Sequence, residues 1–158
     1  MLVRTDPAAL AAGARPADWP WPGERVWIPH RVVRTPDGSR PIRLEATFYP
    51  PTGPEPAPLA IITHGSDVGR TQLRTWSFST EAHWLHAQGF AVLALMRRGR
   101  GASEGVNGEE DFGRAHDGSL VDISSGVAQA VEDLESAIAF GRALPGVRPG
   151  PVLLVGQS

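Results

Sequence analysis

The chain has 158 residues, a hydrophobic fraction of 41% and a formal net charge of −2. This length is enough for one domain with a hydrophobic core, and the charge balance gives no reason to expect a nucleic-acid partner. Cysteine is absent, and all fifteen basic residues are Arg. These two absences exclude thiol nucleophiles, thiolate metal sites, disulfides, a Walker P-loop lysine and a Ser–Lys dyad within these residues. No apolar run approaches the ~18–20 residues that a membrane span needs, so we expect no membrane-spanning helix.

Residues 1–22 are rich in Ala and Pro and read as an irregular leader, ahead of one domain over residues 23–158. The leader lacks the basic start and apolar run of a signal peptide. We therefore expect a cytoplasmic protein by default, or a secreted one if a signal precedes this sequence. The oligomeric state is left open.

The first regular segments predict an antiparallel hairpin. Arg25 to Val33 is rich in β-branched residues, residues 35–38 form a turn signal, and Ile42 to Tyr49 alternates apolar and polar positions. A Pro-rich loop follows, and then the pattern changes to three continuous apolar runs, at 59–63, 90–96 and 152–155. Such runs are typical of strands buried on both faces of a parallel sheet.

Two helices are predicted between the apolar runs. The first covers Glu81 to Gln88, with Ser79 or Thr80 as its N-cap and Gly89 as its stop. The second covers about 122–144, with an apolar stripe of Val127, Val131, Leu134 and Ile138. The element order predicts an α/β fold, in which an antiparallel hairpin leads into a parallel sheet with flanking helices.

Ser158 follows the third apolar run in the segment Gly156-Gln157-Ser158. A serine on a sharp turn directly after a buried strand is the first half of a G-x-S-x-G nucleophile elbow, in which small neighbours let the hydroxyl project above the sheet. A tripeptide of this kind also occurs in ordinary loops. We take Ser158 as the candidate nucleophile.

His64-Gly65-Ser66 follows the first apolar run, so its backbone is predicted to lie near Ser158 at the carboxyl edge of the sheet. A backbone N–H at this place can stabilise an oxyanion, and glycine allows a close approach to substrate. The alternative is a plain turn with a hydrogen-bonded histidine. We assign Ser66 as the candidate oxyanion donor, with His64 and Gly65 shaping the turn, and expect His64 to be structural.

Residues 97–105 carry two misleading patterns. A Gly-x-Gly-x-x-x-Gly spacing suggests a dinucleotide site, but no helix is predicted to open there, and three acids follow at 109–111. The same stretch contains a complete G-x-S-x-G match at Ser103. The preceding strand ends several residues too early for an elbow, so we expect Ser103 to be a loop serine.

The remaining candidates have simpler interpretations. His83 and His86 are spaced to share a metal, but no third ligand is evident, so we expect an exposed helix face and no metal site. For Trp76 and Trp84 we expect core packing. His30 and His116 have no partner that the sequence identifies.

Taken together, these segments resemble the α/β-hydrolase superfamily over roughly residues 24–158. Within it the chain is similar to the dienelactone-hydrolase-like branch, close to the CocE/NonD and prolyl-oligopeptidase-like hydrolases. The resemblance implies the amino-terminal half of that fold, ending at the nucleophile elbow. It also implies that Ser158 is the nucleophile, that Ser66 is an oxyanion donor, and that the triad acid and His lie beyond residue 158.

The implied function is a serine hydrolase that acts on small ester or related acyl substrates without a cofactor or metal. Three alternatives stay open. The 158 residues are a non-catalytic fragment or pseudo-enzyme, or the protein is a peptidase of the same fold, or it is a dinucleotide-binding module. We expect the chain alone to be inactive because it lacks the acid and His of a triad.

Overall fold

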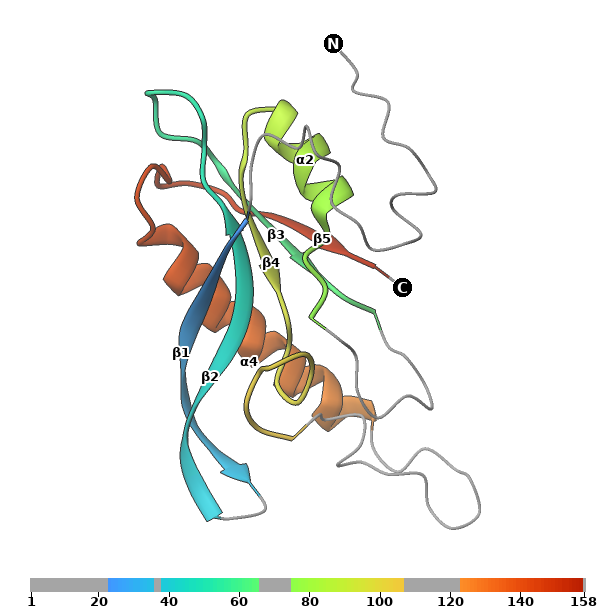
Figure 1. Ribbon diagram of the computed structural model, residues 1–158. Coiled ribbons are helices and arrows are strands. Elements are labelled where there is room, and N and C mark those ends of the chain that lie inside the picture. Colours follow the sequence, from blue (N-terminus) through green and yellow to red (C-terminus); the bar gives the residue numbers. More distant parts are fainter. Residues whose placement is uncertain (1–22, 36–37, 66–74, 107–122, 158) are drawn as a thin grey trace.

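A computed structural model describes residues 23–35, 38–65, 75–106 and 123–157 (Figure 1). These described residues form one five-stranded sheet and two helices. In chain order the elements are β1 (Glu24–Thr35), β2 (Gly38–Tyr49), β3 (Leu59–Thr63), α2 (Ser79–Ala87), β4 (Ala91–Leu95), α4 (Ile123–Arg142) and β5 (Leu153–Gly156). The predicted hairpin, apolar strands and helices are all present.

The strand order in the sheet is β1-β2-β4-β3-β5. β1 pairs with β2 and β2 with β4 in antiparallel fashion, whereas β3 pairs in parallel with both β4 and β5. In Figure 1 the long β1–β2 hairpin lies along one side of the sheet and β5 along the other. The mixed topology matches the expectation of an antiparallel start followed by parallel strands.

The three parallel strands end in register. Thr63, the last residue of β3, pairs with Leu95 of β4 on one side and with Gly156 of β5 on the other. The segments that follow these strands therefore leave the sheet at the same edge. This shared carboxyl edge is where open α/β sheets place their ligand sites.

β3 and β4 are continuous apolar runs because each of their faces is covered by a helix. One face, formed by alternate residues of β3 and β4 such as Ile61 and Leu93, packs against α4 around Ala137. The other face, with Ile62 and Val92, packs against α2 around Leu85. Since side chains alternate along a strand, a strand between two helices needs apolar residues at every position. The expectation of burial on both faces is wrong for β5, whose Leu153 and Leu154 are exposed because no described element covers them.

The start of α2 differs from the prediction. The N-cap is Phe78, with φ 49° and no side-chain capping bond, and Ser79 lies inside the first turn. Phe78 is buried in the cluster that contains Ala82 and Leu85, so burial of its ring fixes the entry of the helix in place of a hydroxyl cap. Gly89, with φ 86°, ends the helix as expected, and its N–H donates to the carbonyl of His86.

The predicted apolar stripe of α4 is correct in its second half and wrong in its first. Leu134 and Ile138 pack on the core, but Val127 and Val131 are exposed. The second half of α4 therefore packs on the sheet, whereas no described element covers Val127 and Val131 in its first half. The helix approaches β3 closely at Gly141, where an added Cβ would lie 2.6 Å from a methyl carbon of Leu59.

β5 has no second neighbour among the described residues. Leu153 is 40% exposed and Leu154, which points to the other face, is 50% exposed. Among the described segments, no helix combines the length and apolar character required to cross a membrane.

Candidate active site at the carboxyl edge of the sheet

The turn after β3 and the turn after β5 are directly adjacent. The N–H of Gln157 donates to the carbonyl of Thr63 at 3.1 Å, which continues the β3–β5 ladder one residue past the strands. Gly65 and Gln157 are thus the last described residues before the two predicted site serines. Ser66 and Ser158 themselves lie outside the described residues, so their roles remain predictions.

His64 is buried and bridges the ends of β3 and β4. Its Nε2 accepts a hydrogen bond from the backbone N–H of Arg97 at 3.2 Å. A neutral imidazole that accepts at Nε2 carries its proton on Nδ1, and Nδ1 lies 2.8 Å from the carbonyl oxygen of Gly65, to which it donates. One ring nitrogen therefore bonds to the backbone that follows β4, and the other bonds to the turn after β3.

The Arg97 side chain reaches the same turn. Its Nη2 donates to the carbonyl oxygens of His64 and Gly65, each at 3.2 Å. The Gly65 oxygen therefore accepts from a guanidinium and from an imidazole at once. Two neighbouring carbonyl groups of the turn are held toward the end of β4 by one fixed, permanently charged group.

Ser103 is a structural serine in the loop after β4. Its hydroxyl is buried, donates to the carbonyl of Met96 at 2.6 Å, and accepts from the N–H of Glu45 at 2.8 Å. The loop turns back on itself through Gly99 and Gly101, with φ of 69° and 58°, and it opens no helix as far as residue 106. The segment with the complete G-x-S-x-G pattern is therefore a turn that hydrogen-bonds to β2.

Glu45 is a buried carboxylate that sequence reasoning overlooked. Its Oε2 accepts from the Ala102 N–H at 2.7 Å and from the Thr75 hydroxyl at 2.8 Å, and its Oε1 pairs with Arg25 at 2.6 Å. It therefore ties two segments that flank the carboxyl edge to β2. The only signal in the sequence that could have indicated this role is a charged residue, Glu45, within the alternating run Ile42 to Tyr49.

Comparisons with known proteins agree with this architecture. No protein-family profile matches the chain. It is 28% identical over 131 residues to the quorum-quenching protein AidA of Acinetobacter baumannii, an alignment that covers 83% of this chain and 37% of AidA. Among solved structures it is similar to the α/β hydrolase GrgF from Penicillium sp. sh18, with 22% identity and a TM-score of 0.54 over 85% of this chain and 37% of that one.

Two esterases of known structure are also similar to the chain. The Pyrococcus furiosus esterase Pf2001 is 16% identical with a TM-score of 0.55, over 90% of this chain and 42% of that one. Acetyl xylan esterase 1 from Thermoanaerobacterium sp. JW/SL YS485 is 20% identical with a TM-score of 0.54, over 87% and 45%. The chain has the α/β-hydrolase fold. It spans about two fifths of the length of these proteins, and the predicted amino-terminal half of that fold is confirmed.

Beneath α4, the α/β-hydrolase fold of this chain holds a buried charged cluster. Arg98 donates to Asp133 from its backbone N–H and from Nε, each at 2.8 Å, and its Nη2 reaches Glu132 at 2.9 Å and His30 Nε2 at 3.0 Å. The His30 Nδ1 in turn lies 2.6 Å from the hydroxyl of Ser136. The cluster joins β1, the loop after β4 and α4.

This cluster places Ser136, His30 and Asp133 in the order of a catalytic triad, beside a shallow cavity of about 240 Å³ lined in part by His30 and Ser136. The tautomer rules out that role. Arg98 donates to Nε2, so the His30 proton is on Nδ1 and points at the serine oxygen. A histidine that donates to a hydroxyl cannot remove its proton, so this arrangement is structural.

Burial lowers the pKa of His30 below its usual value of 6.5, against the opposing effect of the Asp133 carboxylate, and the nearby Arg98 and Arg31 lower it further. The fold therefore favours the neutral imidazole of His30 over the protonated form. The Glu104 carboxyl, which accepts from the backbone N–H of Arg43, has its pKa lowered by that hydrogen bond.

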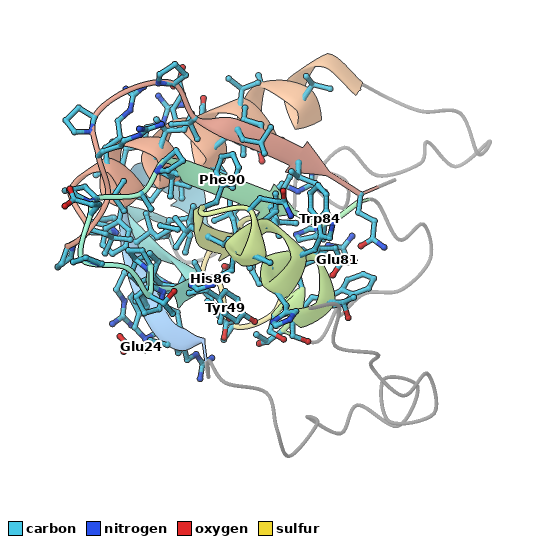
Figure 2. All side chains as sticks on the ribbon, turned by 90° about the horizontal axis from the view of Figure 1, so that it is seen from above. Glu24, Tyr49, Glu81, Trp84, His86 and Phe90 are labelled. Atoms are coloured by element: carbon cyan, nitrogen blue, oxygen red, sulfur yellow. The ribbon has the colours of Figure 1, made fainter. Side chains whose placement is uncertain are left out.

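Several side-chain expectations for α2 and the segment before it are wrong. His86 is buried, and its Nε2 donates to the carbonyl of Pro50 at 2.8 Å, so the histidine pair does not form an exposed face. Figure 2 labels His86 together with Trp84, which also belongs to α2. Trp84 and Trp76 are exposed rather than packed in the core, although the Trp76 ring stacks on Phe78 at 5.2 Å. Among the described residues no His, Asp and Glu cluster suited to a metal occurs. His116 and residues 109–111 lie outside the described residues.

Proposed function

We propose that the protein is a serine hydrolase of small ester or related acyl substrates, with Ser158 as its nucleophile. The observation that carries the proposal is the registered ending of β3 and β5, where Gln157 bonds to Thr63. It brings the ends of β3 and β5, from which the chain continues toward the two predicted serines, to the same carboxyl edge. A nucleophile and an oxyanion donor must both lie within about 3 Å of the reacting group.

In the proposed reaction the Ser158 oxygen attacks the substrate carbonyl carbon, and the carbonyl oxygen becomes an oxyanion that accepts from the Ser66 N–H. A histidine takes the serine proton and gives it to the leaving group as the acyl-enzyme forms. Water then attacks the acyl carbon while the same histidine takes its proton. The acyl–serine bond breaks, the histidine returns the proton to the Ser158 oxygen, and the carboxylic acid product leaves. Loss of one oxyanion donor typically lowers kcat by ~10²–10³.

We propose that this histidine and its carboxylate come from polypeptide beyond residue 158. Three described histidines, His30, His64 and His86, are engaged in buried hydrogen bonds that fix their tautomers or positions. In this fold the triad members occur in the order Ser, Asp or Glu, His along the chain. Residues 1–158 alone are therefore inactive under this proposal.

The exposed β5 edge supports a further part of the proposal, that the isolated 158 residues associate or aggregate. Leu153 and Leu154 present apolar surface on both faces of a strand whose outer N–H and C=O groups have no strand partner among the described residues. Unpaired apolar edges of this kind template intermolecular pairing. A further strand and helix would cover them.

The test compares the complete protein with residues 1–158 in hydrolysis of p-nitrophenyl acetate. We expect turnover by the complete protein that Ser158→Ala abolishes, and none by the shorter chain. A monomeric 1–158 chain with a cooperative thermal melt and Ser158-dependent turnover would contradict the proposal. Parallel assays with a p-nitroanilide of the same acyl group separate an esterase from a peptidase.

A further inference from the structure

Two alternative charge pairings are available in the buried cluster of His30, Arg98, Glu132, Asp133 and Ser136. In the structure the His30 side chain is fully buried, and its Nε2 accepts from Arg98 Nη2 at 3.0 Å. The same Nη2 lies 2.8 Å from Asp133 Oδ1, and Arg98 Nε donates to that oxygen, also at 2.8 Å. Arg98 is therefore bonded at once to the histidine and to the carboxylate beside it.

A proton on His30 Nε2 is incompatible with this pairing. It turns the acceptor into a donor and places two positively charged donors, His30 Nε2–H and Arg98 Nη2–H, 3.0 Å apart. Asp133 Oδ1 lies 3.5 Å from His30 Nε2, so it is placed to accept the new N–H. The protonated imidazole therefore competes with Arg98 for one carboxylate oxygen.

Other acceptors for the displaced guanidinium already lie within reach on α4. Arg98 Nη2 is 2.9 Å from Glu132 Oε2 and 3.3 Å from the carbonyl oxygen of Gln129. The Glu132 side chain is 27% exposed, whereas that of Asp133 is 1% exposed, so this second position lies closer to solvent. With His30 on Asp133 and Arg98 on Glu132, both cations keep a carboxylate partner.

We propose that this cluster is an acid-sensitive switch in which protonated His30 takes the Asp133 carboxylate and the Arg98 guanidinium moves to Glu132. The proton comes from solvent and adds to the lone pair of Nε2, so no covalent bond breaks. The switch loosens the contact between α4 and the loop after β4. The residue before Arg98, Arg97, donates to the His64 and Gly65 carbonyls, so the change reaches the turn after β3.

The charged side chains around the ring come from three elements. Among the described residues they are Arg31 of β1, Arg98 of the loop after β4, and Glu132, Asp133 and Glu135 of α4. Burial lowers the pKa of His30, against the opposing effect of Asp133, and the two arginines lower it further. The pairing seen in the structure thus disfavours the proton, so proton uptake and the exchange of partners favour each other as the pH falls.

The experiment follows the His30 ring nitrogens and the Arg98 Nε–H of the complete protein by ¹⁵N NMR between pH 7.5 and 5. It also measures the exchange protection of the Arg98 backbone N–H, which donates to Asp133 Oδ2 at 2.8 Å. His30→Gln keeps an acceptor for Arg98 but does not titrate. His86→Gln is the matched control, because His86 is a buried histidine on α2 that bonds to Pro50. None of these measurements requires catalytic activity.

We expect His30 Nε2 to be unprotonated at pH 7.5 and to take up a proton with a midpoint below about pH 6.5. The Arg98 Nε–H resonance should change with the same midpoint, and protection of the Arg98 backbone N–H should fall by about 10-fold or more, because the protonated fraction grows about tenfold per pH unit. The amides of Ile61 and Leu93 in the core should stay protected. His30→Gln should abolish the response, and His86→Gln should retain it.

Four results would each overturn the inference. They are a protonated His30 Nε2 at pH 7.5, unchanged Arg98 signals down to pH 5, an acid response that persists in His30→Gln, and a loss of protection shared by Ile61 and Leu93, which would indicate global unfolding. If His30→Gln does not fold, the wild-type titration still decides, because the Arg98 and His30 signals must then change with one midpoint.

Discussion

Replacing Asp133 by Ala should be one of the most destabilising single changes in the described part of the chain. Its carboxylate is 1% exposed and receives bonds from the backbone N–H, Nε and Nη2 of Arg98, each at 2.8 Å. The Arg98 side chain is itself only 7% exposed. Removing one partner of a buried ion pair typically costs ~3–5 kcal/mol, because the other charge stays buried without compensation.

Glu132, the residue before Asp133, provides a matched control. Glu132 contacts the same Arg98 Nη2 at 2.9 Å, but its side chain is 27% exposed. Partly exposed ion pairs contribute ~1 kcal/mol or less. Glu132 remains beside Arg98 in Asp133→Ala and offsets part of the lost charge, so we expect a loss of about 3 kcal/mol, near the lower end of the range for a broken buried pair.

The assay is urea unfolding of the complete protein, followed by far-UV circular dichroism. We expect Asp133→Ala to lower the free energy of unfolding by about 3 kcal/mol, out of a typical total of ~5–15 kcal/mol, and Glu132→Ala by less than about 1 kcal/mol. Asp133→Asn, which keeps volume and one acceptor oxygen, should fall between them. Equal losses for Asp133→Ala and Glu132→Ala would refute the reasoning from burial.

Three further predictions concern the loop after β4 and His30. Ser103→Ala should lower the free energy of unfolding by about 1–3 kcal/mol, because the Glu45 N–H and the Met96 carbonyl lose a buried partner. A variant as stable in urea as the wild type would contradict this. Calorimetric titration with NADPH should show no binding to the 97–105 loop, which opens no helix; a micromolar Kd would restore the dinucleotide alternative. Because the pKa of His30 is lowered in the folded state, the unfolded state takes up this proton at a higher pH. The contribution of His30 to the free energy of unfolding is therefore complete above about pH 6.5 and falls as the pH drops below that value. His30→Gln should flatten this dependence between pH 7.5 and 5, and an unchanged slope would show that another group is responsible.

Most of the backbone architecture could be predicted because it follows from local patterns. The continuous apolar runs predict β3, β4 and β5 as strands, although only β3 and β4 are buried on both faces, and the turn signal at 35–38 separates two alternating strands. Gly89 marks the end of α2 for a conformational reason that needs no tertiary contact. Such signals lie within a few residues of the feature they predict.

The polar interior could not be predicted, because its partners are far apart in the chain. His30 bonds to Arg98 and Ser136, and Glu45 bonds to Ala102 and Thr75, so no local pattern reveals these pairs. The exposure of Trp84 and the burial of His86 likewise depend on where α2 lies on the sheet. For the site, the sequence indicates which strand ends converge, but the hydrogen bonds around Gly65 depend on the tertiary structure.

The most direct test of the central claim is covalent labelling of the complete protein with a fluorophosphonate probe, followed by peptide mass spectrometry. The account predicts a label on Ser158 that Ser158→Ala abolishes and Ser103→Ala leaves intact. Labelling that survives Ser158→Ala and disappears in Ser103→Ala would contradict the assignment of the nucleophile.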